Sequence, residues 1–98
     1  MPSFAVGETI VRTLVEEHLI ACGNLLPGAV SLYRWEGEVV REEEVLVLIK
    51  ADSAAVDRVF ERLAELHPYS VPELIELSTE SVSRAYGRWV VESTEVPA

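Results

Sequence analysis

The spacing of apolar residues near the start of the chain predicts an amphipathic helix over residues 4–20. Val6, Ile10 and Leu14 recur at every fourth position, and a second apolar row lies one step round the helix. Ser3 precedes this stripe, and a serine hydroxyl at that place accepts a hydrogen bond from a free amide of the first turn. We therefore expect the helix to begin directly after Ser3 and to bury one face.

The next part of the chain is rich in β-branched and aromatic residues, which indicates a hairpin. Two strands are predicted over 29–35 and 38–50, and the intervening Glu36-Gly37 is an X-Gly turn signal. The second strand contains the uninterrupted apolar run at 45–49, so both of its faces are apolar there. A strand of this kind is typical of a central or covered position in a sheet.

The second half of the chain predicts a helix, a short strand and a further helix. Apolar spacing favours a helix over 53–66 that ends at His67, because a residue before proline is pushed out of the α region. A strand over 73–77 and a helix over 80–93 follow. This order is α+β and matches a ferredoxin-like βαββαβ sandwich with a C-terminal helix, except that the first strand is missing from this chain.

The composition fits a single folded domain, which we assign to residues 1–98. Hydrophobic residues make up 49% of the chain, which excludes a disordered or low-complexity protein. The longest charge-free run, residues 19–33, is too short and too broken by glycine and proline to span a membrane. One cysteine excludes an internal disulfide, and no signal peptide is visible, so a reducing cytoplasmic location is expected.

The charge balance narrows the choice of partners. The chain has seventeen acidic and eight basic residues, which gives a formal net charge of −9. Such a surface repels phosphates, so nucleic acid and anionic membranes are disfavoured partners. Cations are its natural small partners, although a high net charge also serves plain solubility.

Few residues carry recognisable chemistry. His67 lies in a segment stiffened by two prolines and is either a metal ligand or general acid/base, or a cap of the preceding helix. Cys22 is either a soft copper ligand or a small buried hydrophobe. The acidic residues 42–44 either collect divalent cations or form a solvated edge that blocks strand pairing. Neither a catalytic motif nor a metal-ligand spacing is present.

Several ordered motifs nevertheless resemble the CutA divalent-cation tolerance family. The resemblance covers roughly residues 3–94 and includes His-Pro-Tyr-Ser-Val-Pro-Glu at 67–73. The matching segments are residues 14–28, 31–38, 43–50, 67–73 and 86–89.

The resemblance implies a ferredoxin-like protomer in a compact homotrimer, with long hairpins that extend the sheets between subunits. It also implies a role in tolerance of copper and other divalent metal ions, with His67 as a metal ligand. Two further ligands of the family have no counterpart, because Leu66 stands before His67 and the thiol of the first strand is missing with its strand. The residues expected near a ligand cleft between subunits are Tyr33, Trp35, Lys50, Tyr69 and Glu73.

Three function classes follow from these observations. The first is a trimeric protein that binds copper(II) or another divalent cation, with no cofactor required for folding. The second is a PII-like signalling trimer that binds a small ligand or a partner, or a purely structural trimer. The third, an enzyme that uses His67 with Glu73, is disfavoured, and we expect no enzymatic activity.

Overall fold

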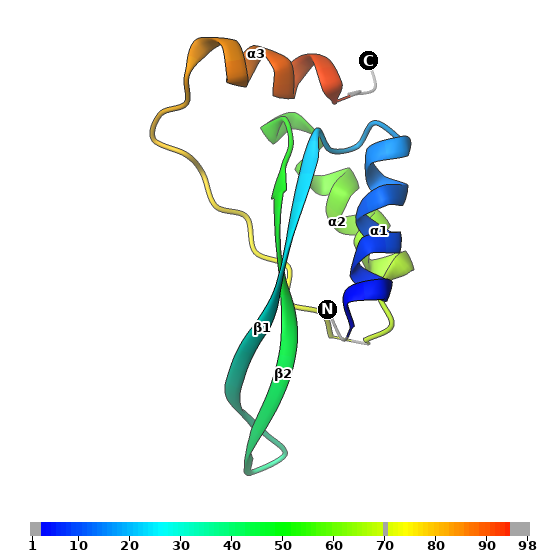
Figure 1. Ribbon diagram of the computed structural model, residues 1–98, viewed down its shortest axis with the longest axis vertical. Helices are drawn as coiled ribbons and strands as arrows, with labels where there is room; N and C mark the ends of the chain where they lie inside the picture. The colour runs from blue at the N-terminus through cyan, green and yellow to red at the C-terminus, as the bar shows by residue number, and fades with distance from the viewer. Residues whose placement is uncertain (1–2, 70, 95–98) are drawn as a thin grey trace.

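The structure is a computed structural model that describes residues 3–69 and 71–94. The predicted domain over 1–98 also includes residues 1–2, 70 and 95–98, which lie outside this description. Figure 1 shows a long hairpin with two helices on one face and a third helix across the end of the hairpin opposite to its turn. The elements are α1 (Phe4–Glu16), β1 (Cys22–Trp35), β2 (Glu38–Lys50), a short 3-10 helix η1 (Ser53–Ala55), α2 (Val56–Leu66) and α3 (Arg84–Ser93).

Helix α1 begins as predicted and ends four residues early. The Ser3 hydroxyl accepts a hydrogen bond from the Val6 amide at 3.2 Å, which confirms the N-cap. At the other end His18 adopts a left-handed backbone with φ 59°. The His18 amide then donates to the Val15 carbonyl and the Leu19 amide to the Leu14 carbonyl, which closes the helix in a Schellman motif. The predicted extension to residue 20 is therefore wrong.

Strand β1 begins at Cys22, seven residues before the predicted start, and pairs antiparallel with β2. Glu36 and Gly37 both have positive φ, 48° and 80°, as in the tight hairpin turns that match strand twist. Pro27-Gly28 is a β-bulge inside the strand instead of its start, since the register shifts between Leu26 and Ala29. Proline has no amide to pair and Gly28 has φ 85°, so both residues suit an unpaired position.

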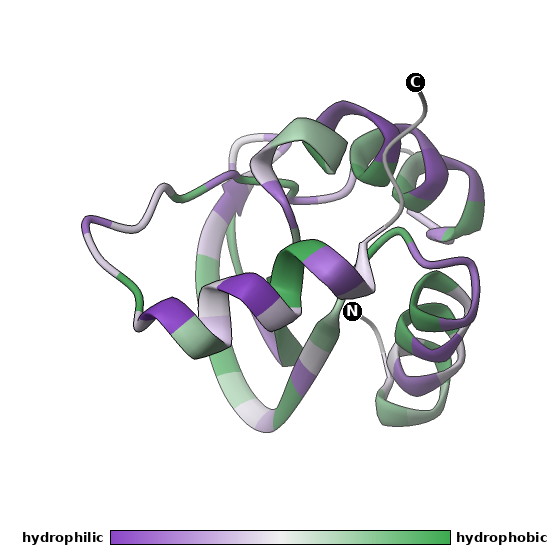
Figure 2. Ribbon diagram, turned by 90° about the horizontal axis from the view of Figure 1, so that it is seen from above, coloured by the Kyte–Doolittle hydropathy of each residue, from purple (hydrophilic) through white to green (hydrophobic). Residues whose placement is uncertain are grey.

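The hydrophobic core lies between the two helices and one face of the hairpin. Leu14 and Ile20 are the largest fully buried side chains, and Leu25 and Val47 pack against the core from the sheet. Figure 2 shows hydrophobic and hydrophilic positions alternating round the helices, as expected when one face is buried. The opposite, open face of the hairpin is not covered by the described residues. The core cluster consists of Ile10, Val11, Leu14, Leu19, Ile20, Ala55, Val59 and Leu63.

The C-terminal part of the chain packs less closely. The predicted strand over 73–77 is extended but is not part of a sheet, because no described strand lies beside it to pair with its backbone. Leu74 still packs against the core. Helix α3 begins at Arg84, four residues later than predicted, and none of its residues is buried. An α+β architecture is confirmed, in a chain whose described helices are all too short or too polar to cross a membrane.

Candidate functional site

Helix α2 ends at His67, whose side chain contacts Tyr69. Its amide donates to the Leu63 carbonyl at 2.8 Å, and its backbone is extended, as Pro68 requires. The imidazole does not cap the helix carbonyls. Instead, its Nδ1 accepts a hydrogen bond from the Tyr69 amide at 3.0 Å, and the two rings pack at a centroid distance of 4.8 Å. The predicted capping role of this side chain is wrong.

This hydrogen bond fixes the tautomer of His67. A ring nitrogen that accepts from an amide carries no proton, so the proton of the neutral imidazole lies on Nε2. Burial lowers the pKa of His67 below its ordinary value, an effect opposed by the negative charge of Glu44. The neutral form is therefore favoured at pH 7. A metal ion can bind Nε2 of the neutral ring only after the proton moves to Nδ1, and Nδ1 then no longer accepts the hydrogen bond from Tyr69.

Two tyrosines and two glutamates surround this segment. Tyr33 and Glu42 are diagonal neighbours across the hairpin, since Tyr33 pairs with Val40. Partial burial raises the pKa of Tyr33, and the nearby Glu42 carboxylate raises that pKa further. Burial and the charges of Glu42 and Glu44 likewise raise the pKa of Tyr69. Both phenols are therefore protonated at neutral pH, in a negative environment. We call these residues, together with His67, the waist cluster.

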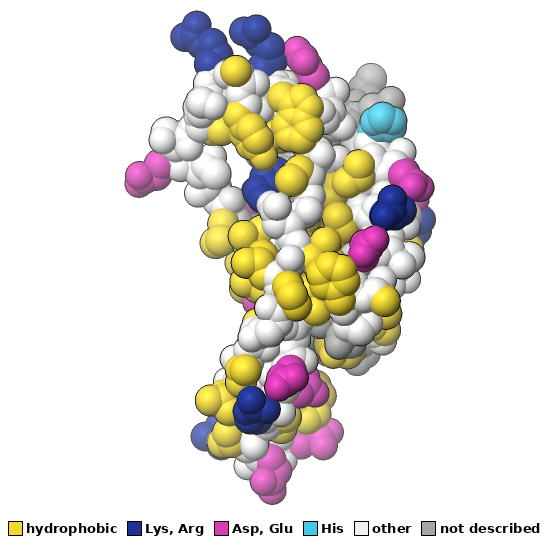
Figure 3. All heavy atoms as spheres, viewed as in Figure 1, with side chains coloured by type: hydrophobic (Ala, Val, Ile, Leu, Met, Phe, Trp, Pro, Cys, Tyr) yellow, Lys and Arg dark blue, Asp and Glu magenta, His cyan; other side chains and the backbone are white. Residues whose placement is uncertain are grey.

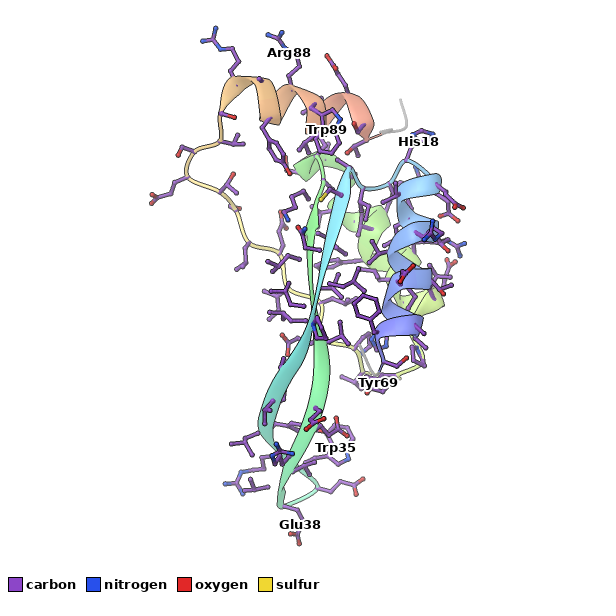
Figure 4. All side chains as sticks on the ribbon, viewed as in Figure 1. His18, Trp35, Glu38, Tyr69, Arg88 and Trp89 are labelled. Atoms are coloured by element: carbon purple, nitrogen blue, oxygen red, sulfur yellow. The ribbon has the colours of Figure 1, made fainter. Side chains whose placement is uncertain are left out.

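The other predicted cleft residues lie away from the waist cluster. Trp35 is 53% exposed beside the hairpin turn, and Figure 4 shows it well separated from Tyr69. Lys50 lies at the opposite end of the ladder, where its Nζ donates to Asn24 Oδ1. Glu73 is exposed on the extended segment after α2. One chain thus places Tyr33 and Tyr69 near the same two carboxylates, those of Glu42 and Glu44. A cleft completed by other subunits stays a prediction.

Cys22 and the acidic residues of the hairpin have plain structural positions. Cys22 is half-buried at the start of β1, with its Sγ 3.8 Å from Asn24 Oδ1, so it is not the fully buried hydrophobe that was one of the two predictions. Figure 3 shows acidic side chains gathered around the hairpin tip. Among residues 3–69 and 71–94, no group of three or more His, Cys, Asp and Glu side chains can hold a metal ion.

Sequence reasoning missed one charged contact. Arg62 of α2 donates to both carboxylate oxygens of Glu17, at 2.9 Å and 2.7 Å, and also to Glu65 at 2.8 Å. The hydrogen bond to Arg62 lowers the pKa of the Glu17 carboxyl. Helical spacing suggests the contact between Arg62 and Glu65, but nothing in the spacing brings residues 17 and 62 together. This network joins the end of α1 to α2 and lines a polar surface pocket between them.

Comparisons with known proteins agree with the motifs. The model of the CutA1 divalent ion tolerance protein family matches residues 1–93. The divalent-cation tolerance protein CutA of Thermus thermophilus is 46% identical over 94 residues, which is 96% of this chain and 91% of that protein. Mouse Protein CutA is 39% identical over 96% of this chain, which spans only 53% of the mouse protein.

Solved structures of two relatives are also similar to the structure of this chain. The T. thermophilus protein superposes with a TM-score of 0.93 at 45% identity, covering 97% of this chain and 92% of that one. The protein described as the PII-like protein CutA from Nostoc gives a TM-score of 0.85 at 41% identity, covering 96% of this chain and 91% of that one. On the family match and these identities, the chain belongs to the CutA1 divalent ion tolerance family.

Proposed function

We propose that this protein is a cytoplasmic, non-enzymatic subunit of a homotrimer that binds copper(II) or another divalent cation between its subunits. The observation that carries the proposal is the open face of the hairpin, where Leu26, Leu46 and Leu48 are each more than 40% exposed. Contiguous apolar surface of this kind marks an interaction site in a protein. In addition, an isolated two-stranded hairpin is only marginally stable in water.

The α3 helix supports the same conclusion. Its rings of Tyr86 and Trp89 pack together at 5.6 Å, yet both residues are exposed in the single chain. Figure 4 shows Trp89 on the side of α3 that faces the end of the hairpin. An amphipathic helix without a buried residue is stabilised when a second surface covers its apolar side.

The waist cluster is the part of each subunit best suited to a cation. It supplies two carboxylates, Glu42 and Glu44, and one imidazole, which together suit borderline divalent metals. Because a single described chain holds no closed set of three donors, donors from another copy would complete the site. His67 would have to give up its hydrogen bond from Tyr69, so we expect modest affinity.

The oligomer is tested by light scattering on the full chain. A trimer of 10.9 kDa chains has a mass near 33 kDa. A monomer at micromolar concentration would contradict the trimer.

Metal binding is tested by copper(II) titration. Calorimetry gives the affinity, and electron paramagnetic resonance shows whether nitrogen is a ligand. We expect His67→Ala to weaken binding at least about tenfold, which corresponds to about 1.4 kcal/mol. The matched control is His18→Ala, because His18 is exposed and is the other of the two histidines. Equal affinities for the His67→Ala and His18→Ala variants would remove His67 as a ligand.

A small-ligand signalling trimer is the second candidate. It is favoured by the similarity to the solved PII-like protein and by the absence of a three-donor metal group among the described residues. Thermal unfolding with added nucleotides distinguishes the two candidates. A nucleotide-dependent rise in the unfolding midpoint that His67→Ala leaves unchanged supports this candidate over the first.

A further inference from the structure

A polar surface pocket of about 220 Å³ lies between the end of α1 and helix α2. Both helices cover the same face of the hairpin, so the pocket is on the side opposite the open face (Figure 1). Pockets for drug-sized ligands have roughly 300–1,000 Å³, and this one therefore has room for a small molecule only. Its lining, which we call the helix pocket, consists of Glu17, Leu19, Arg58, Glu61, Arg62 and Glu65.

Arg62 is the most firmly held charged group of the helix pocket. Its guanidinium donates two hydrogen bonds to Glu17 and one to Glu65, and its side chain is 33% exposed. A guanidinium has five N–H donors, so two of them have no partner among residues 3–69 and 71–94. Because Glu17 and Glu65 already hold the group in place, the binding of an acceptor to these two donors costs little side-chain entropy.

Two further charged groups of the helix pocket have no counter-ion. Arg58 and Glu61 are both exposed, and neither forms an ion pair in the described part of the chain. Arg58 precedes Arg62 by four residues, so the two guanidiniums belong to neighbouring positions on the surface of α2. The hydrogen bond from Arg62 lowers the pKa of the Glu17 carboxyl, and the charge of Arg58 lowers it further. Arg58 therefore acts on the α1 side of the pocket as well.

The charges of the lining favour a ligand that carries both signs. Three carboxylates and two guanidiniums leave one net negative charge in the helix pocket. A simple anion would be repelled by the carboxylates, and a simple cation would gain nothing from the donors of Arg58 and Arg62. A molecule with a carboxylate and an ammonium group side by side satisfies both sets, because charge-assisted hydrogen bonds form at each end.

We propose that the helix pocket binds a free α-amino acid, with its carboxylate against Arg58 and Arg62 and its ammonium group against Glu61. Leu19 is the single hydrophobic member of the lining and is only 4% exposed, so an apolar side chain of the ligand gains little. Small amino acids such as alanine therefore suit the pocket. Exposed ion pairs are individually weak in water, and we expect a Kd in the millimolar range. The proposal does not depend on metal binding, because no residue of the helix pocket belongs to the waist cluster.

Three matched probes test the two ends of the ligand separately. L-Alanine carries both charges, propionate lacks the ammonium group, and ethylammonium lacks the carboxylate. Each probe is titrated into the full 98-residue chain at constant ionic strength, and the readout is the NMR shift of the Leu19 amide and of Nε–H of Arg62. We expect propionate and ethylammonium to bind at least about fivefold more weakly than alanine.

The alternative outcomes are distinct. Propionate that binds as tightly as alanine would show an anion site, and ethylammonium that does so would show a cation site. Either result overturns the proposal. Absence of a shift in both signals at about 100 mM alanine overturns it as well.

Substitutions on α2 test the position and the orientation of the ligand. Both Arg58→Gln and Glu61→Gln should leave the fold intact, since these side chains are exposed and form no described ion pair. We expect Arg58→Gln to weaken alanine and propionate about fivefold, and Glu61→Gln to weaken alanine without weakening propionate. Equal losses of both probes in Glu61→Gln would overturn the assigned place of the ammonium group.

A matched control removes an exposed arginine elsewhere. Arg12 lies on α1 outside the helix pocket, so Arg12→Gln makes the same change of net charge as Arg58→Gln. We expect alanine to bind Arg12→Gln within about twofold of its affinity for the unsubstituted protein. An equal loss in Arg12→Gln and Arg58→Gln would overturn the proposed site, because it would reflect only the total charge of the chain.

Discussion

The close approach of α1 to β1 at Gly23 predicts a measurable coupling between Gly23 and Val11. Gly23 lies near the start of β1, where it pairs with Ile49, and Val11 is buried on α1. A Cβ atom built on Gly23 would lie 2.5 Å from Val11 Cγ1 and 3.3 Å from Val11 Cγ2. Because methyl groups need nearly 4 Å, Gly23→Ala forces the helix and strand apart by about 1 Å.

The cost follows from two opposing effects. Overpacking of this kind destabilises by about 1–3 kcal/mol. Alanine also lowers the entropy of the unfolded chain, which offsets about 0.4–1 kcal/mol. We therefore expect Gly23→Ala to lower the free energy of unfolding by about 1–2 kcal/mol, or the midpoint by about 4–16 °C at fixed protein concentration.

A double-mutant cycle tests the cause. Val11→Ala alone removes two buried methyl groups and should cost about 2 kcal/mol. In the double variant the alanine methyl at 23 occupies part of that space, so the combined loss should fall short of the sum by about 1–2 kcal/mol. Urea unfolding of the four proteins gives this coupling, and a value below about 0.5 kcal/mol would refute the steric argument.

A second glycine provides the control. Gly87 lies in α3, and a Cβ there would lie 3.1 Å from Cγ1 of Val82, which is exposed and free to turn. Gly87→Ala should therefore leave stability unchanged or raise it by up to about 1 kcal/mol, the usual gain in a helix.

Three further predictions concern titration and backbone strain. His18→Gly should stabilise the fold by about 1 kcal/mol, because glycine adopts the left-handed cap freely, whereas His18→Ala should not; thermal unfolding measures both. The pKa of Glu17 is lowered in the folded state, so its contribution to stability is present above its unfolded pKa and lost as pH falls. The free energy of unfolding of Glu17→Gln should therefore fall less steeply with decreasing acidic pH than that of the unsubstituted protein. An equal pH dependence of the two proteins counts against the Arg62 contact. The pKa of His67 is lowered below 6.5, so stability should fall as pH drops below that value, and His67→Gln should lose this dependence in the same assay.

The sequence predicts features that depend on single residues better than it predicts which segments lie side by side. The N-cap at Ser3, the turn at 36–37 and the end of α2 before Pro68 all rest on the chemistry of single residues, and each is confirmed. The end of α1 is missed because Leu19 is buried by the cap that ends the helix, so its apolar character continues the helical stripe beyond the helix.

The remaining errors concern what lies beside a segment. Residues 73–77 have the apolar character of a strand, but a pattern cannot show whether a neighbour is present to pair with them. Two residues of the waist cluster, His67 and Tyr69, can be predicted as site residues because they lie in a sequence motif. That Nδ1 of His67 accepts a hydrogen bond is a property of three-dimensional geometry, and it decides which nitrogen can reach a metal.

The β-bulge at Pro27-Gly28 acts as a phase shift in the alternation of side chains along β1. It inserts one residue, so the odd-numbered residues that face the helices before the bulge lie on the opposite face after it. Tyr33 and Glu42 share a face because the hairpin turn pairs Tyr33 with Val40, and the extra residue lets this outer register coexist with the inner pairing of Leu26 with Leu46. Deletion of Gly28 would place Pro27 directly opposite Val45 and leave both registers in one uninterrupted ladder. The bulge thus lets one strand direct odd-numbered side chains toward the helices at its inner end and away from them at its outer end.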